Sequence, residues 1–210
     1  MTTQNTITIF GDGRSGNCHK VRLICELTEQ PFQWQEVDVL SGDTRRDDFL
    51  KLNPNGRLPT MRRADGTTLW ESNAILFELA QNTPWWPADP RAQSATLQWM
   101  FFEQYSHEPF IAVNRFIQSI GMEMETRAAE YQANLKKGAA ALHVMEQHLL
   151  EHAYLGPREE QPVETPSIAD ICLYAYTHVA HEGGFDLGNF PGIRFWLTRL
   201  EMEHGFERMG

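Results

Sequence analysis

The residues that decide the fold are Asn53–Ile75, which read NPNGRLPTMRRADGTTLWESNAI. Two short strand-like runs, Leu58–Arg62 and Thr67–Trp70, flank an Asp-Gly pair, and this pattern is typical of a tight hairpin. A helix is expected to begin near Ser72, because apolar residues at helical spacing follow it. The segment therefore predicts a strand–strand–helix unit.

The residues before this segment alternate between strand and helix patterns. Ile7–Phe10 is a short β-rich run, the apolar residues after Lys20 follow helical spacing, and Gln33–Val39 alternates again. Asp47–Leu52 reads as a short helix that stops at an Asn-Pro pair, because the residue before a proline resists helical angles. The order β-α-β, then β-β-α, is that of the thioredoxin fold with a mixed four-stranded sheet.

The residues beyond this first domain, expected at 1–82, have almost entirely helical patterns. The stretch NTPWWPADP at 82–90 contains three prolines, so we expect residues 83–90 to be a linker. The second domain, residues 91–210, is expected to contain the helices Arg91–Arg115, Glu125–Glu151, Ser167–Ala180 and Ile193–His204. Ser167 and Asp170 have the spacing of a capping box, which indicates a role in folding. The expected fold class is an α/β thioredoxin-like domain followed by an all-α helical bundle domain.

The composition argues against several classes of function. With 18 Lys plus Arg and 28 Asp plus Glu, the net charge is −10, which disfavours nucleic acid or an anionic membrane as the main partner. No apolar run approaches the roughly 20 residues needed to span a bilayer, and the N-terminus lacks the pattern of a secretory signal. The three cysteines are widely spread, so we expect free thiols and a cytoplasmic protein. Neither a metal-ligand spacing nor a phosphate-binding glycine loop is found, so no metal and no cofactor are expected.

Three segments of the first domain together resemble the glutathione-transferase superfamily, in its bacterial-type cytosolic form. They are RSGNCHKVR at 14–22, NPNGRLPT at 53–60 and ESNAI at 71–75. They occur in the family's order, within the expected fold, and the resemblance covers essentially the whole chain. It implies that the first domain binds glutathione as co-substrate, and that a small hydrophobic electrophile binds against the helical domain.

Glu71 and Ser72 match the acid–serine pair with which the family binds the glutamyl end of glutathione. The resemblance implies that Glu71 binds the ammonium group, and that the hydroxyl and N–H of Ser72 bind the carboxylate. A helix start suits a carboxylate, because its N–H groups are unpaired and carry partial positive charge. The plainer interpretation is that Ser72 caps the helix, and the two roles are compatible.

Pro59 matches the family's cis-proline, which turns the backbone of the preceding residue toward the cysteinyl part of glutathione. The resemblance implies a cis Leu58–Pro59 bond and binding through the N–H and C=O of Leu58, whereas a trans proline at a sheet edge is the alternative. In the loop over the glycine end of the tripeptide, the matching positions are Thr44 and Arg45. A cation there suits the glycyl carboxylate, although either residue can simply face solvent.

The resemblance places the group that activates the glutathione thiol just after the first strand. A cysteine thiol titrates near pH 8.5, so a thiolate at neutral pH needs a hydrogen bond or a helix N-terminus. The segment contains no tyrosine, and the candidate catalytic residues are Ser15, as in serine-type members, and Asn17, as in some bacterial and fungal members. The adjacent Cys18 is either a packed, inert thiol or a participant in glutathione-dependent disulfide exchange.

A stretch rich in aromatic residues, WMFFEQYSHEP at 99–109, lies in the first long helix of the second domain. A stripe of this kind packs in a core more often than it binds a ligand. In the family, however, this helix lines the pocket for the electrophile. The resemblance therefore makes Phe102, Tyr105, His107 and Arg115 candidate lining residues.

The function that the resemblance implies is that of a cytoplasmic glutathione S-transferase, a detoxification enzyme that conjugates glutathione to small hydrophobic electrophiles. Members of the family are usually homodimers, so a homodimer is expected. Two alternatives remain open. One is a glutathione-dependent disulfide-bond oxidoreductase with Asn17 as the thiol contact, and the other is a non-catalytic, transferase-like interaction protein.

Overall fold

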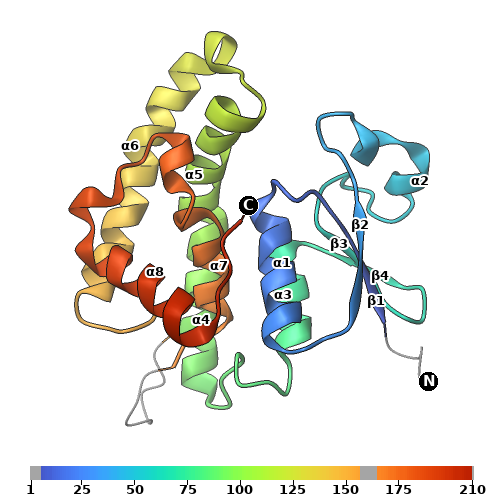
Figure 1. Cartoon of the computed structure of the whole chain (residues 1–210), viewed down its shortest axis with the longest axis horizontal. Coiled ribbons are helices and arrows are strands. Elements are labelled where there is room, and N and C mark those ends of the chain that lie inside the picture. Colours follow the sequence, from blue (N-terminus) through green and yellow to red (C-terminus); the bar gives the residue numbers. More distant parts are fainter. Residues whose placement is uncertain (1–5, 157–164, 210) are drawn as a thin grey trace. The chain divides into compact units, whose positions relative to one another are not determined.

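The computed structural model describes residues 6–156 and 165–209 of the 210-residue chain. It divides into two compact units, Met1–Thr83 with Met209–Gly210 and Pro84–Arg208. The first unit contains a β-sheet with helices, and the second is helical (Figure 1).

The first unit is built on a four-stranded mixed sheet in the order β2-β1-β3-β4. β1 (Ile7–Gly11) pairs in parallel with β2 (Phe32–Glu36) and antiparallel with β3 (Thr60–Arg62). β3 in turn pairs antiparallel with β4 (Thr68–Trp70). The β-α-β, then β-β-α order expected from the sequence is confirmed.

Helices cover both faces of this sheet. α1 (Gly16–Leu27) and α3 (Ser72–Ala80) lie side by side on one face (Figure 1). The core beneath these two helices is apolar and consists of Ile7, Ile9, Val21, Cys25, Met61 and Ile75. On the other face, Phe49 of α2 (Asp47–Leu50) packs against Phe10 and Val37. Because burial of an aliphatic or aromatic side chain contributes about 1.5–3 kcal/mol, the two cores hold these helices against the sheet.

The second unit is built from helices, one of which is completely buried. Its elements are α4 (Pro90–Phe102), a π-helical turn (Glu103–His107), α5 (Glu108–Arg115), a second π-helical turn (Phe116–Ile120), α6 (Met124–Leu149), α7 (Ile168–Thr177) and α8 (Pro191–His204). All ten residues of α7 are buried, as expected of a helix that is apolar on nearly every face. Short 3₁₀ turns at Ala180–Gly183 and Leu187–Asn189 complete this unit, and another 3₁₀ turn, Asp43–Arg45, belongs to the first unit.

The capping box predicted at the start of α7 is confirmed. The hydroxyl of Ser167 accepts from the N–H of Ala169 at 3.2 Å, and Asp170 accepts from the N–H of Ser167 at 2.8 Å. Asp170 is fully buried and also accepts from the indole N–H of Trp196 at 2.9 Å. This pair therefore fixes α7 in the helical core and has a structural role.

Several expected boundaries were wrong for local physical reasons. α1 begins at Gly16, ahead of the apolar spacing after Lys20, because Ser15 caps it there. β3 begins at Thr60, because Leu58 and Pro59 take part in the cis bend before it. The helix expected over 91–115 is interrupted by the π-helical turn at Glu103–His107, a feature that periodicity does not signal.

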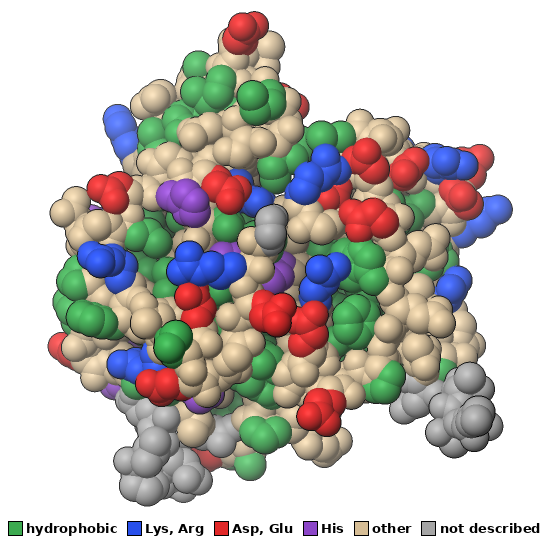
Figure 2. Space-filling model, in the orientation of Figure 1, with side chains coloured by type: hydrophobic (Ala, Val, Ile, Leu, Met, Phe, Trp, Pro, Cys, Tyr) green, Lys and Arg blue, Asp and Glu red, His purple; other side chains and the backbone are tan. Residues whose placement is uncertain are grey.

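Charged side chains of both signs are interspersed on the face drawn in Figure 2. Among the residues that the structure describes, no helix is long and apolar enough to cross a membrane. Over the same residues, no group of three or more His, Cys, Asp or Glu side chains could hold a metal ion.

Candidate functional site

The N-terminus of α1 forms the first part of the site. Ser15 has an extended backbone, caps the helix, and accepts a weak hydrogen bond from the N–H of Cys18 at 3.4 Å. Asn17 follows in the first turn, and both side chains are partly exposed. Since the positive end of the helix dipole lies here, the position favours a bound anion such as a thiolate.

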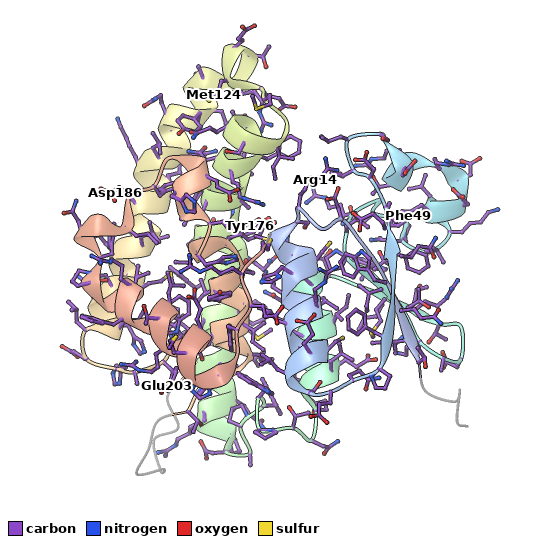
Figure 3. All side chains as sticks on the ribbon, viewed as in Figure 1. Arg14, Phe49, Met124, Tyr176, Asp186 and Glu203 are labelled. Carbon is purple, nitrogen blue, oxygen red and sulfur yellow. The ribbon has the colours of Figure 1, made fainter. Side chains whose placement is uncertain are left out.

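A buried carboxylate fixes the loop that leads into α1. Asp12 is 1% exposed and accepts from the N–H of Arg14 at 2.9 Å and from its guanidinium at 2.6 Å. Burial alone would raise the pKa of Asp12, but hydrogen bonds from Arg14 and Val39 outweigh burial and lower the pKa. Arg14, labelled in Figure 3 between β1 and α1, also pairs with Asp38 at 2.6 Å. Asp12 therefore stays ionised and holds the residues just before Ser15.

The N-terminus of α3 forms the second part of the site. Glu71 occupies the N-cap position, with its side chain exposed and making no capping hydrogen bond. Its backbone angles, φ 74° and ψ 113°, lie in a region that L-residues rarely adopt. Such strain costs on the order of 1–3 kcal/mol and is concentrated at functional sites. Ser72 is the first helical residue and is 5% exposed, so it is not the helix cap.

Hydrogen bonds join the two helix starts. The hydroxyl of Ser72 donates to Oδ1 of Asn17 at 3.2 Å. It also accepts from the ammonium of Lys20 at 3.4 Å, and the same ammonium donates to Oδ1 of Asn73 at 3.3 Å. The structure thus brings together Asn17 and Ser72, for which the sequence predicts separate subsites. The sequence does not predict Lys20 and Asn73 as site residues. The one indication of them is that they lie within the family-like segments at 14–22 and 71–75.

The bend before β3 forms the third part of the site. The Leu58–Pro59 bond is cis, as predicted. Asn53, 1% exposed, donates to the carbonyl of Arg57 at 2.8 Å and to Oγ1 of Thr60 at 3.1 Å. Within the described part of the chain, the N–H and C=O of Leu58 make no hydrogen bond. The main chain of Leu58 is therefore available to pair with an extended ligand.

Two loop residues, Thr44 and Arg45, are predicted to bind the glycine end of glutathione. One of these side chains is buried and the other is exposed. Thr44 is 4% exposed, whereas Arg45 is exposed and donates to the carbonyl of Asn55 at 3.3 Å. The side-chain amide of Asn55 reaches Oε1 of Glu71 at 3.5 Å. Gly56, at φ 60°, lets Arg45 lie against the loop, because a Cβ there would collide with the guanidinium. Asn55 therefore links Arg45 to Glu71, a role that the sequence did not signal.

Cys18 lies behind the site and has no exposed surface. Burial raises the pKa of its thiol to about 12, against the weaker opposing effect of a hydrogen bond with Ser15. The thiolate is the reactive form of cysteine, so this thiol is unreactive near neutral pH. The structure favours the inert-thiol interpretation of Cys18.

The four candidate pocket residues of the helical unit lie in different environments. Tyr105 is 85% exposed, and Phe102 packs edge-on against Trp99 at 5.3 Å. His107 is fully buried and shares a 3.0 Å hydrogen bond with Thr177. Arg115 is 6% exposed and pairs with Glu182 at 2.6 Å. His107 and Arg115 therefore contribute to the interior of the unit, and only Phe102 and Tyr105 offer accessible surface.

Comparisons with known proteins agree with this arrangement. Residues 14–82 match the glutathione S-transferase N-terminal domain. The structure of a glutathione S-transferase from Pseudomonas fluorescens is 50% identical, with a TM-score of 0.89, over 94% of this chain and 95% of that one. The disulfide-bond oxidoreductase YfcG of Escherichia coli is 29% identical over 88% of this chain and 85% of that protein.

A further solved structure shows the shared fold. The theta class glutathione S-transferase of Xanthomonas axonopodis pv. citri, solved with glutathione bound, is 24% identical with a TM-score of 0.85, over 97% of this chain and 96% of that one. The 50% identity to the Pseudomonas structure, with the match of residues 14–82 to the N-terminal domain, establishes that the chain belongs to the glutathione S-transferase superfamily.

Proposed function

We propose that this protein binds glutathione on its first unit and conjugates it to small hydrophobic electrophiles. The observation that carries the proposal is the hydrogen bond between Ser72 and Asn17 at 3.2 Å, which joins the N-termini of α3 and α1. Two helix starts, each favourable to an anion, then lie within reach of one short ligand that carries a carboxylate at one end and a thiolate in the middle. The theta class relative solved with glutathione bound supports this choice of ligand.

In the proposed complex, each part of the tripeptide has a partner of suitable chemistry. Glu71 takes the glutamyl ammonium, Ser72 takes the glutamyl carboxylate, and the main chain of Leu58 pairs with the cysteinyl residue beside Pro59. The exposed Arg45 suits the glycyl carboxylate, with Thr44 buried behind the same turn. The glutathione is a co-substrate, and we propose no further cofactor.

The proposed reaction needs a thiolate, which Ser15 and the start of α1 stabilise. The thiol proton is lost to solvent, the sulfur attacks the electrophilic carbon, and a C–S bond forms as the leaving group departs with the bonding electrons. A hydroxyl hydrogen bond and a helix N-terminus both favour the charged sulfur over the neutral thiol. We place the electrophile against the helical unit, near Phe102 and Tyr105.

A second reaction is favoured by the position of Asn17 and by the likeness to YfcG. In it, one glutathione thiolate attacks a disulfide, forms a mixed disulfide and releases a thiol. A second glutathione then attacks the mixed disulfide, which yields oxidised glutathione and the second thiol. Two electrons pass from two glutathione molecules to the substrate, and no protein cysteine takes part.

Calorimetry and two assays test these proposals. Wild-type protein is titrated with reduced and with oxidised glutathione, and then assayed for conjugation of an aromatic halide and for reduction of a small dialkyl disulfide. Binding with conjugation supports the transferase, and binding with disulfide reduction alone supports the oxidoreductase. Binding without either turnover would favour the non-catalytic interaction protein, and no binding would refute the glutathione site.

We also propose a cytoplasmic homodimer that acts in detoxification. All three cysteines are free thiols, which is typical of a reducing compartment. Trp70 on the edge strand β4 and Phe77 on α3 are 38% and 40% exposed, so apolar surface is available on the first unit. Sedimentation velocity should give about twice the chain mass of 24.2 kDa, and a single species at the chain mass would refute the dimer.

A further inference from the structure

Glu36 is the last residue of the edge strand β2, and its exposed side chain is held at both oxygens (Figure 1). Oε1 accepts from the N–H of Gly13 at 3.0 Å, and Oε2 accepts from the indole N–H of Trp34 at 2.6 Å. A carboxylate acceptor makes such bonds charge-assisted, which is the stronger kind. An exposed glutamate usually samples several rotamers, whereas this carboxylate is directed at the loop that leads into α1.

Trp34 is itself fixed, because its ring takes the place that a side chain at Gly11 would fill. A Cβ at Gly11 would lie 2.4 Å from the ring, so a larger residue there would displace the indole. The guanidinium of Arg22, on α1, lies 4.3 Å from the centre of the same ring, a favourable cation–π distance. The indole is therefore held between β1 and α1 with its N–H directed at Glu36.

The loop between β1 and α1 depends on anchors of this kind. Its sequence, GDGRS at 11–15, contains two glycines, and glycine has the widest range of backbone angles. Asp12 is 1% exposed and holds the buried side of the loop, whereas the bond from Gly13 to Glu36 ties the exposed side to β2. Both Gly13 and Glu36 line a surface depression of about 520 Å³. The N–H of Ser15 donates to the carbonyl of Asp12 at 2.9 Å, so the position of the loop sets that of Ser15.

We propose that Glu36, oriented by Trp34, is a positioning residue that fixes the Ser15 hydroxyl for its hydrogen bond to the glutathione thiolate. The inference rests on the proposed function, in which Ser15, and not Glu36, contacts the sulfur. A functional group must be held within about 0.5 Å of its productive position, and an anchor on each side of the loop provides that precision. Glu36 acts through the main chain of Gly13, because its own negative charge would favour the neutral thiol over the thiolate.

The sign of a change in the pKa of bound glutathione separates this role from a charge effect. Loss of a nearby negative charge alone would lower the pKa, whereas a misplaced Ser15 hydroxyl would raise it. Glu36→Ala should raise the pKa by about 0.4 to 1 unit and slow conjugation at neutral pH about two- to tenfold, the range that one hydrogen bond supports. Glu36→Gln loses the charge but keeps a carbonyl acceptor for Gly13, so the pKa should not rise. The pKa is measured from the pH–rate profile with an aromatic halide and from the ultraviolet absorbance of the thiolate.

A double-mutant cycle tests whether Trp34 acts through Glu36. Trp34→Phe keeps an aromatic ring beside Arg22 and removes the indole N–H. It should raise the pKa of bound glutathione in the wild-type background and leave it unchanged in the Glu36→Ala background. Gln35→Ala is the matched control, because this side chain is exposed on the same strand and points to the opposite face of the sheet. Circular dichroism checks that each variant is folded, and the two Glu36 variants decide if Trp34→Phe is not.

Other outcomes overturn the proposal. A lower pKa in both Glu36 variants would show a charge effect alone, and an unchanged pKa in both would show that Glu36 has no role at the sulfur. An equal effect of Trp34→Phe in both backgrounds would refute the part given to Trp34.

Failure of the proposed function is separable from failure of the anchor. If wild type does not bind glutathione, the proposed function fails, and amide hydrogen exchange in the ligand-free proteins still tests the anchor. Exchange at Gly13 and Ser15 should be faster in Glu36→Ala than in wild type or Gln35→Ala. Equal exchange rates would refute the positioning of Ser15 by Glu36.

Discussion

The hydroxyl of Ser72 donates to the side-chain carbonyl of Asn17 at 3.2 Å, across 55 residues of sequence. A hydroxyl has one hydrogen, so Ser72 cannot donate at the same time to Asn17 and to a ligand carboxylate. A carboxylate bound at the start of α3 would therefore displace Asn17 from this bond. The anchor of the glutamyl group and one of the two candidate thiol contacts are thus coupled.

Ser15 is expected to be the main donor to the glutathione sulfur. Ser15→Ala should raise the pKa of bound glutathione by about one to two units, because a hydrogen bond to the thiolate is lost. That corresponds to about 1.4–2.7 kcal/mol, or a ten- to hundredfold loss of conjugation rate at neutral pH. The measurement is the pH–rate profile, with the bound thiolate followed by its ultraviolet absorbance. Ser15→Thr keeps the hydroxyl and should retain most of the activity.

Asn17 is expected to matter more for disulfide reduction than for conjugation. Asn17→Ala removes the acceptor of the Ser72 hydroxyl and a possible amide donor to sulfur, while the cap of α1 at Ser15 remains. Both activities are measured side by side in the two alanine variants. If Asn17→Ala shifts the conjugation profile and Ser15→Ala does not, the roles are reversed and the oxidoreductase becomes the better assignment.

Glu71 is expected to bind the glutamyl ammonium. Glu71→Gln should weaken glutathione binding by about 1.5–3 kcal/mol, the scale of a hydrogen bond to a charged group. Stability should change little, because an acid at a helix start contributes only about 0.3–1 kcal/mol. Asp47→Asn removes an acid from the first turn of α2 and should leave binding unchanged. An unaltered dissociation constant in Glu71→Gln would show that Glu71 does not bind the glutamyl ammonium.

Cys18 is expected to be inert in the folded protein. Burial raises the pKa of Cys18 and of Cys25 to about 12, and Cys172 is buried as well. An aromatic disulfide reagent at pH 8 should therefore label none of the three until guanidinium unfolds the chain. Cys18→Ala should retain any disulfide reductase activity, whereas loss of that activity with binding intact would show that this thiol takes part.

His178 is expected to make the helical unit sensitive to acid. Burial lowers the pKa of His178 from 6.5 to about 4, so the folded state excludes a proton that the unfolded chain takes up near pH 6.5. Its contribution to stability is therefore present above pH 6.5 and is lost as the pH falls to 4, by on the order of 3 kcal/mol. Burial raises the pKa of Asp170 to about 6, so the folded state takes up this proton before the unfolded chain does. Protonation of Asp170 therefore favours the folded state as the pH falls from 6 to 4, opposite to the effect of His178.

The contribution of His178 is isolated by comparison with His178→Asn. The unfolding free energies of wild type and variant are measured in urea at several pH values between 6.5 and 4. Titratable groups common to both proteins cancel in the difference between the two unfolding free energies. As the pH falls from 6.5 to 4, wild type should lose stability relative to His178→Asn. A difference independent of pH would mean that His178 titrates alike in the folded and unfolded chains.

The parts of the fold that depend on local chemistry could be predicted from the sequence. Proline at 59, the Asp-Gly hairpin and the capping residues Ser167 and Asp170 each act on neighbouring residues, and the cis bond, the hairpin and the capping box are all found. The start of α3 at Ser72 was also predicted, because apolar spacing begins there.

The contacts between distant segments could not be predicted in this way. Lys20 is polar in a helical pattern, and only the packing of α1 beside α3 shows that its ammonium is buried against Ser72. The side-chain amide of Asn55 reaches Glu71, and His107 is buried in the helical unit beside Thr177. Such relationships depend on tertiary packing, for which hydrophobic periodicity carries no information.

The backbone of Glu71 has a consequence for the evolution of this protein. Its φ of 74° suits glycine, so Glu71→Gly should relieve about 1–3 kcal/mol of strain, against about 0.5–1 kcal/mol of added chain entropy. The variant should melt at a higher temperature than the natural chain and bind glutathione less tightly. Selection for heat resistance alone would then favour loss of the glutamate, and under the proposed function the ligand is the reason to keep it.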